Sequence, residues 1–145
     1  MQVDPRGPRF GAAVTTAVLV AVLVTGSWAL LAVQAVVFAV ATLLGIRYAP
    51  YGLLFKALIR PRLAPPRELE DAAPPRFAQG VGLAFALVGT VGYATGITWL
   101  GIGATALALA AAFLNAVFGF CLGCEMYLLF RRITAKFRSE REVPV

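Results

Sequence analysis

The chain has no histidine, only two cysteines and only two serines. Without histidine, Ser-His-Asp catalysis, Cys-His catalysis and histidine-based metal sites are excluded. No glycine-rich phosphate-binding loop of the G-x-x-x-x-G-K type is present. Charged residues are also scarce, since they make up 14% of the chain against about 25% in soluble domains. These absences leave thiol chemistry as the main chemical option and argue against a soluble protein.

Long uncharged apolar runs fill most of the 145 residues, of which 60% are hydrophobic. The mean hydropathy is +0.82, and the runs lack the period-two alternation of barrel strands, so they predict transmembrane helices. We expect an all-α fold: a four-transmembrane-helix bundle built from two similar helical hairpins, each followed by a short interfacial helix. It forms a single integral membrane domain, residues 1–145, with spans near 10–25, 28–46, 77–95 and 98–118.

The first apolar run also resembles the core of a signal peptide, with a basic start and a small-residue end. A second apolar run begins immediately after it, at Trp28, which favours a first transmembrane helix instead.

Short motifs recur in the two halves of the chain. The sequence PRF at residues 8–10 returns at residues 75–77, and LLFK at residues 53–56 returns as LLFR at residues 128–131. Since each half crosses the membrane twice, the halves would be parallel rather than inverted repeats. The match further predicts that Glu125–Phe137 is an interfacial helix like Pro50–Arg60.

All thirteen lysines and arginines lie in residues 1–9, 47–76 and 131–141, and neither hairpin turn contains one. With four spans, these three segments share one face, which the positive-inside rule makes cytoplasmic. We therefore expect an integral inner-membrane protein with both termini, the 47–76 loop and the basic tail 131–145 in the cytoplasm. We attribute the net charge of +6 to basic segments that interact with the lipid bilayer surface. We expect no nucleic-acid partner.

Small residues form stripes along the third and fourth spans. These stripes predict close helix packing, with a substrate groove as the alternative. Their members are Ala78, Gly82, Gly89, Gly92 and Gly96 in the third span, and Gly101, Thr105, Ala108, Ala112, Asn115 and Gly119 in the fourth. The intramembrane amides of Gln34 and Asn115 are expected to hydrogen-bond across helices, with a permeation path as the alternative.

Cys121 and Cys124 form a C-x-x-C pair at the end of the last apolar run. Three functions fit the pair: a redox dithiol, a metal site shared within an oligomer, or inert small apolar residues. Gly119 and Gly123 weaken the helix here. If the helix breaks, Cys121 lies near the positive N-terminal end of the next helix. If it continues, both cysteines share one face.

We expect Cys121 to be the attacking thiol and Cys124 the more buried resolving thiol, with the pair reduced at rest. Glu125 either transfers a proton during exchange or pairs with Arg47 or Arg131. No bound organic cofactor is implied.

The four spans, the Pro-rich basic middle loop and the sequence FCLGCEMY at residues 120–127 resemble the actinobacterial domain-of-unknown-function 4395 family of small membrane proteins. The resemblance covers residues 3–137, and its distinctive motif is Cys121-x-Gly123-Cys124-Glu125. It implies thiol or sulfur chemistry, with a thioredoxin-like or sulfurtransferase protein as partner.

The function we expect is thiol–disulfide or sulfur-relay chemistry at the cytoplasmic face of the membrane. The alternatives are a small transporter or transporter subunit for a reduced sulfur species, and a non-catalytic assembly subunit that forms a homo-oligomer through its glycine stripes.

Overall fold

A computed structural model describes residues 2–65 and 69–142, and within them the chain is almost wholly helical. The expected all-α class is confirmed. The α-helices are α1 (Arg6–Thr25), α2 (Trp28–Leu43), α3 (Pro50–Leu58), α4 (Ala73–Ala94), α5 (Thr98–Phe118) and α6 (Leu122–Glu142). Two short 3₁₀ helices, Ile46–Tyr48 and Arg60–Arg62, and two strands, β1 (Gln2–Val3) and β2 (Glu70–Asp71), lie between them.

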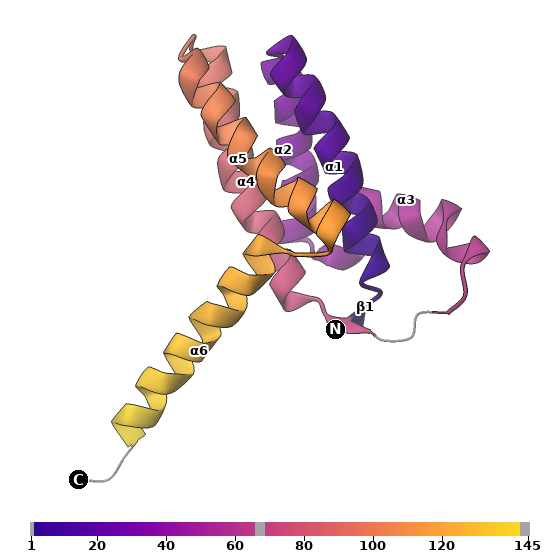
Figure 1. The fold of residues 1–145 in the computed structure, drawn as a ribbon, viewed down its shortest axis with the longest axis vertical. Coiled ribbons are helices and arrows are strands. Elements are labelled where there is room, and N and C mark those ends of the chain that lie inside the picture. The colour runs from indigo at the N-terminus through magenta and orange to yellow at the C-terminus, as the bar shows by residue number, and fades with distance from the viewer. Residues whose placement is uncertain (1, 66–68, 143–145) are drawn as a thin grey trace.

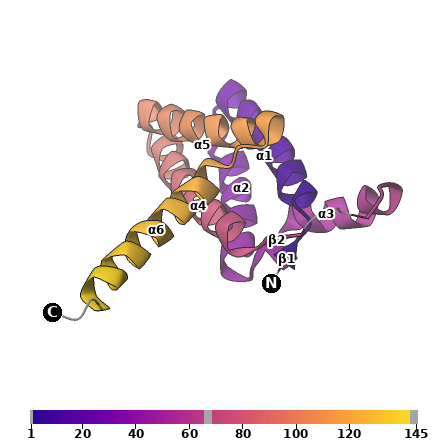
Figure 2. The ribbon, with the colours of Figure 1, turned by 60° about the horizontal axis from the view of Figure 1, so that its bottom comes forward.

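Helices α1, α2, α4 and α5 lie side by side in one bundle, whereas α3 and α6 leave it at the same end as the N-terminus (Figures 1 and 2). Helix α1 packs mainly on α5, α2 packs on α4, and α4 also packs on α5. The described parts of the three basic segments therefore leave the bundle at one end, hereafter the basic end. The core contains Leu19, Val22, Leu31, Ala35, Phe38, Ala86 and Ala108.

Three helices, α1, α4 and α5, are long and apolar enough to cross a membrane. Helix α2 is apolar but has only 16 residues, or about 24 Å, whereas a bilayer core is about 30 Å thick. The second run was expected to extend to residue 46, but the helix ends at Leu43. The chain then reaches Gly45, whose φ of 110° does not fit a helix.

Helix α4 begins at Ala73, earlier than the expected residue 77. Pro74 and Pro75 lie in its first turn, where backbone N–H groups have no partner within the helix and proline is tolerated. The end of the Pro-rich loop expected over residues 47–76 is thus helical. Just before it, β2 pairs antiparallel with β1, with Gln2 opposite Asp71, which brings the N-terminus to the start of α4.

The glycines of α4 allow its neighbours to approach closely, as the packing prediction requires. A Cβ on Gly82 would lie 2.9 Å from the Phe38 ring, one on Gly89 would lie 2.7 Å from Leu31, and one on Gly92 would lie 2.6 Å from the α5 backbone. Gly96 was wrongly placed in this stripe. Its φ is 83° and a Cβ there would meet nothing within 4 Å, because Gly96 forms the turn before α5.

The repeated PRF motif has the same structural role in each half. The Arg9 guanidinium on α1 donates to the last carbonyls of α5, at residues 116 and 117, over 3.2 and 3.0 Å. The Arg76 guanidinium on α4 donates to the carbonyls of α2 at residues 42 and 43, over 2.6 and 3.2 Å. Each arginine therefore satisfies the C-terminal carbonyls of a helix in the other half.

The expectation of a short helix after the second hairpin was wrong. Helix α6 has 21 residues and extends away from the bundle (Figure 1). Only its first turns pack on α4, and the side chains from Leu128 to Ser139 are exposed. Placement of this helix in the membrane interface stays a prediction.

Candidate functional site

The fourth apolar helix breaks before the cysteines, as one of the two sequence alternatives expects. Gly119 follows Phe118 with a left-handed φ of 68°, a conformation that glycine adopts without steric cost. The N–H groups of Gly119 and Phe120 donate to the carbonyls of Asn115 and Leu114, over 3.0 and 3.2 Å. Carbonyl groups in the last turn of α5 thereby have hydrogen-bond donors. Helix α6 starts at Leu122 in a new direction.

Cys121 is the residue directly before α6 and acts as its N-cap. The Cys124 N–H donates to Cys121 Sγ over 3.1 Å, which is the contact that an N-cap side chain makes with the third helical residue. The Glu125 N–H donates to the Cys121 carbonyl over 3.0 Å. Cys121 thus lies at the positive end of the α6 dipole.

Cys121 and Cys124 form a disulfide, with their Cα atoms 5.2 Å apart. Both residues are half-buried, so the expected difference in burial between them stays a prediction, as does the reduced resting state. Among the described residues no group of three or more His, Cys, Asp or Glu side chains could hold a metal ion.

Gly123, between the two cysteines, fixes the start of α6 against α4. It is buried, and a Cβ on it would lie 2.5 Å from Ala78 Cβ and 2.6 Å from Ala78 Cα. Only glycine permits this contact. The cysteine pair therefore lies where the first turns of α4 and α6 meet, at the basic end of the bundle.

A cavity of about 270 Å³, which we call the cysteine cavity, opens beside Cys121. Along α4 its lining runs from Ala78 to Phe85, a rise of about 10 Å into the bundle. Most of the lining is apolar, and its uncharged polar side chains are those of Thr15, Gln79 and Asn115. Asn115 and Cys121 thus line the same cavity.

The two intramembrane amides differ in their surroundings. Gln34 is 1% exposed, and its Oε1 accepts a hydrogen bond from the Tyr51 hydroxyl of α3 over 2.6 Å. Burial raises the pKa of Tyr51, which keeps this donor protonated. The expected inter-helix hydrogen bond is therefore present at Gln34, whereas within the described chain the Asn115 side chain makes no hydrogen bond and lines the cysteine cavity.

Glu125 is exposed and does not form the expected alternative ion pair. Among the described residues the one salt bridge joins Arg6 to Asp4, at 2.9 Å. Arg131 lies over the ring of Tyr127 instead, 5.9 Å from its centroid. The carboxylate of Glu125 is thus open to solvent or to a partner.

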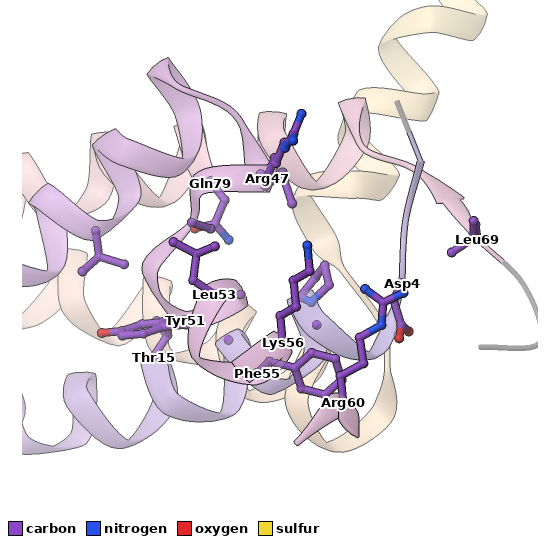
Figure 3. A pocket seen from close by; sticks show the side chains of 17 residues that line it. Asp4, Thr15, Arg47, Tyr51, Leu53, Phe55, Lys56, Arg60, Leu69 and Gln79 are labelled. Carbon is purple, nitrogen blue, oxygen red and sulfur yellow. The ribbon is translucent and has the colours of Figure 1, made fainter. Parts of the chain in front are cut away.

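Arg47 lies away from the cysteines, in a second cavity of about 250 Å³ that we call the basic cavity. Figure 3 shows it with Lys56, Arg60 and Gln79. A hydrogen bond from Arg6 holds the pKa of Asp4, at the mouth of this cavity, below its ordinary value, and the charge of Arg60 acts in the same direction. The arrangement is suited to an anionic group at the membrane surface.

Sequence reasoning missed Thr15 and Gln79, which line both cavities. Gln79 is an amide within the third apolar run, so the signal that singled out Gln34 and Asn115 also applies to it. Thr15 has no comparable signal, because a threonine in an apolar helix often only donates to a carbonyl of its own helix. Its neighbour Thr16 does so, to the carbonyl of Ala12.

A family model described as "Domain of unknown function (DUF4395)" matches residues 3–132. The chain belongs to this family. The DUF4395 match contains the four bundle helices, α3, both cavities and the cysteine pair, and it ends within α6. No curated protein and no solved structure matched the chain.

Proposed function

We propose that this chain is a membrane thiol–disulfide exchange protein whose reacting group is the Cys121–Cys124 pair. The observation that carries the proposal is the position of Cys121: its sulfur caps α6, accepts the Cys124 N–H and lines a cavity. A cysteine at the start of a helix has a stabilised thiolate. Such a thiolate is a good leaving group from a mixed disulfide.

The exchange begins on the closed pair. An incoming thiolate attacks Cys121 Sγ, the Cys121–Cys124 bond breaks, and the electron pair leaves on Cys124, which takes up a proton. A second incoming thiol then attacks the outer sulfur of the mixed disulfide and releases Cys121 as a thiolate. The pair has gained two electrons and the incoming thiols have become a disulfide. The reverse sequence reduces a partner's disulfide to thiols, and the Cys121–Cys124 pair is oxidised back to a disulfide.

Glu125 is the proton carrier in this proposal. It follows Cys124 directly in the chain, lies in the first turn of α6 and is exposed. A carboxylate in that position can accept the proton of an incoming thiol and exchange it with water. Replacing Glu125 with Gln should slow exchange below neutral pH and leave the disulfide itself intact.

The proposal includes four membrane spans, with α2 as a short fourth span and the basic end in the cytoplasm. Support comes from the collection of basic segments at one end of the bundle (Figure 1) and from the positive-inside rule. Reporter fusions at Ser27 and Ala73 should give opposite locations. The same location for both would exclude this topology.

Trapping the thiols in isolated membranes tests the function. Cys124→Ser should accumulate mixed disulfides on Cys121, because the resolving thiol is absent, whereas Cys121→Ser should accumulate none. Mass spectrometry of the trapped species separates exchange with a thioredoxin-like partner, which gives a mixed disulfide, from sulfur relay, which gives a persulfide. Equal trapping in both variants, or in neither, would contradict the assignment.

A transporter for a reduced sulfur species is the second candidate. It is favoured by the extension of the cysteine cavity from Cys121 into the bundle. Uptake of sulfide or thiosulfate into vesicles that contain the purified protein, lost in Cys121→Ser, would support transport in place of exchange.

A further inference from the structure

A groove on the outside of the bundle adjoins the cysteine cavity. The groove lies between α4 and α5 and has a volume of about 350 Å³. Phe85 and Leu107 line both spaces, so the two hollows share a wall at these side chains. The remaining groove residues are Ala84, Val88, Trp99, Leu100, Gly103 and Ala104, and the groove runs from mid-bundle toward the end opposite the cysteines.

The two hollows differ sharply in chemistry. The cysteine cavity offers the hydroxyl of Thr15 and the amides of Gln79 and Asn115 beside Cys121. The groove presents almost entirely apolar side chains, and Leu107 is 61% exposed. A ligand that fills both has a compact head with neutral hydrogen-bonding atoms and a long hydrocarbon tail.

The charge of the cavity lining further restricts which head groups can bind beside Cys121. No described residue that lines the cysteine cavity is charged, and the cations Arg47, Lys56 and Arg60 line the basic cavity instead. A phospholipid phosphate would therefore bind poorly beside Cys121. Carbonyl oxygens suit the site better, because the amide NH₂ groups of Gln79 and Asn115 can donate to them.

We propose that the cysteine cavity binds the ring of a membrane quinone with a polyisoprenoid tail, and that the quinone oxidises the Cys121–Cys124 dithiol. The inference rests on the proposed thiol–disulfide exchange and names its electron acceptor. A C-x-x-C pair that gives electrons to a partner must be reoxidised by an acceptor of two electrons. An acceptor that enters from the bilayer through the groove would reach Cys121 without crossing the basic end.

The reaction balances with the residues present. The Cys121 thiolate adds to a ring carbon of the quinone, and a C–S bond forms while a ring oxygen gains a proton. The Cys124 thiolate then attacks Cys121 Sγ, the C–S bond breaks, and its electron pair returns to the ring. The products are one disulfide and one quinol, because the two thiols have supplied two electrons and two protons.

The test uses the purified full-length protein, reduced, freed of reductant and kept without oxygen in lipid nanodiscs. A prenylated quinone and the same ring without its tail are added in parallel. Disulfide formation is followed by maleimide gel shift and quinol formation by absorbance. We expect one quinol for each disulfide, with the prenylated quinone effective at lower concentration.

Three variants locate the site. Asn115→Leu removes a donor to the ring and should slow oxidation by both quinones about fivefold or more, the effect of one hydrogen bond of about 1 kcal/mol. Gly103→Phe places a ring in the groove at a position where the Cβ itself meets nothing within 4 Å. It should raise the concentration that is required of the prenylated quinone alone. Ala106→Phe is the control, because Ala106 is exposed on α5 but does not line the groove.

The outcomes separate this inference from the function on which it rests. Exchange with oxidised glutathione but no oxidation by either quinone would overturn the quinone site and leave thiol exchange standing. If neither oxidised glutathione nor either quinone reacts with the pair, both the quinone site and the proposed thiol exchange are overturned. Quinone oxidation that is unaffected by Asn115→Leu and Gly103→Phe would show that the ring reacts elsewhere, which also overturns the site.

Discussion

Replacing Gly123 with alanine tests whether the cysteine pair is held in place by the contact between α6 and α4. The added Cβ would lie 2.5 Å from Ala78 Cβ and 2.6 Å from Ala78 Cα, whereas carbon atoms in contact prefer about 3.5–4.0 Å. The two helices must therefore move apart by about 1 Å. Removing the Ala78 side chain cannot restore the fit, because the Ala78 backbone itself is too close.

Two effects of opposite sign compete in this variant. Alanine is favoured over glycine in a helix interior by about 1 kcal/mol, which would stabilise α6. Overpacking a close contact costs typically about 1–3 kcal/mol. Because the obstacle is backbone rather than a flexible side chain, we expect the packing cost to prevail. Net of the alanine gain the cost is at most about 2 kcal/mol, so the melting temperature should fall by up to about 8 °C, at roughly 2–4 °C for each kcal/mol in a domain of this size.

Gly103→Ala is the matched control. It makes the same chemical change in a helix, but a Cβ there meets nothing within 4 Å. We expect Gly103→Ala to raise the melting temperature in detergent and Gly123→Ala to lower it. Disulfide formation between Cys121 and Cys124 should also slow in the second variant alone, because the start of α6 has moved. If both substitutions stabilise the protein equally, the close contact at Ala78 is refuted.

Three further predictions concern the bundle and its basic end. Tyr51→Phe should cost about 1–3 kcal/mol in unfolding experiments, because the buried Gln34 amide loses its partner, and the double variant with Gln34→Leu should recover most of this loss. Gly92→Leu should abolish the folded monomer in size-exclusion chromatography, because the α5 backbone occupies the space of the new side chain. The pKa of Asp4 is lowered by Arg6, so its contribution to stability is present above the ordinary value of 3.8 and is lost as the pH falls through the lower folded-state value. Wild type should accordingly be more stable than Asp4→Asn at pH 6 and should lose that advantage in acid, as followed by circular dichroism.

Periodicity and charge predicted that the helices exist, where the hairpin turns lie and that the basic segments share one end, but not the length of α6. Both signals depend on local rules: apolar runs fold as helices, and lysine and arginine mark the ends of the apolar runs. The same rules overestimated α2, because hydropathy does not register the positive φ of Gly45. They also misassigned Gly96, since a glycine in a turn and a glycine in a packing stripe have the same spacing.

The site was predictable only as far as local chain geometry determines it. Gly119 and Gly123 indicated a weak helix around the cysteines, and the structure has a break there with Cys121 as the cap. The partners that complete the site come from distant helices: Ala78 and Gln79 from α4 and Thr15 from α1. No spacing within residues 115–127 contains that information, because it depends on which helix faces which.

Comparison of the two halves gives a physical reason for assigning the proposed chemistry to the second. Both halves interrupt an apolar helix with a glycine of positive φ, Gly45 in the first and Gly119 in the second, and both start a new helix a few residues later. In the first half the residue before the new helix is Ala49, whose methyl group cannot accept a hydrogen bond. In the second half the same place holds Cys121, whose sulfur accepts one. Cys121→Ala should therefore give the second half the inert helix start of the first, with the bundle folded and every thiol reaction of the pair lost; unfolding of this variant would instead assign the cap a structural role.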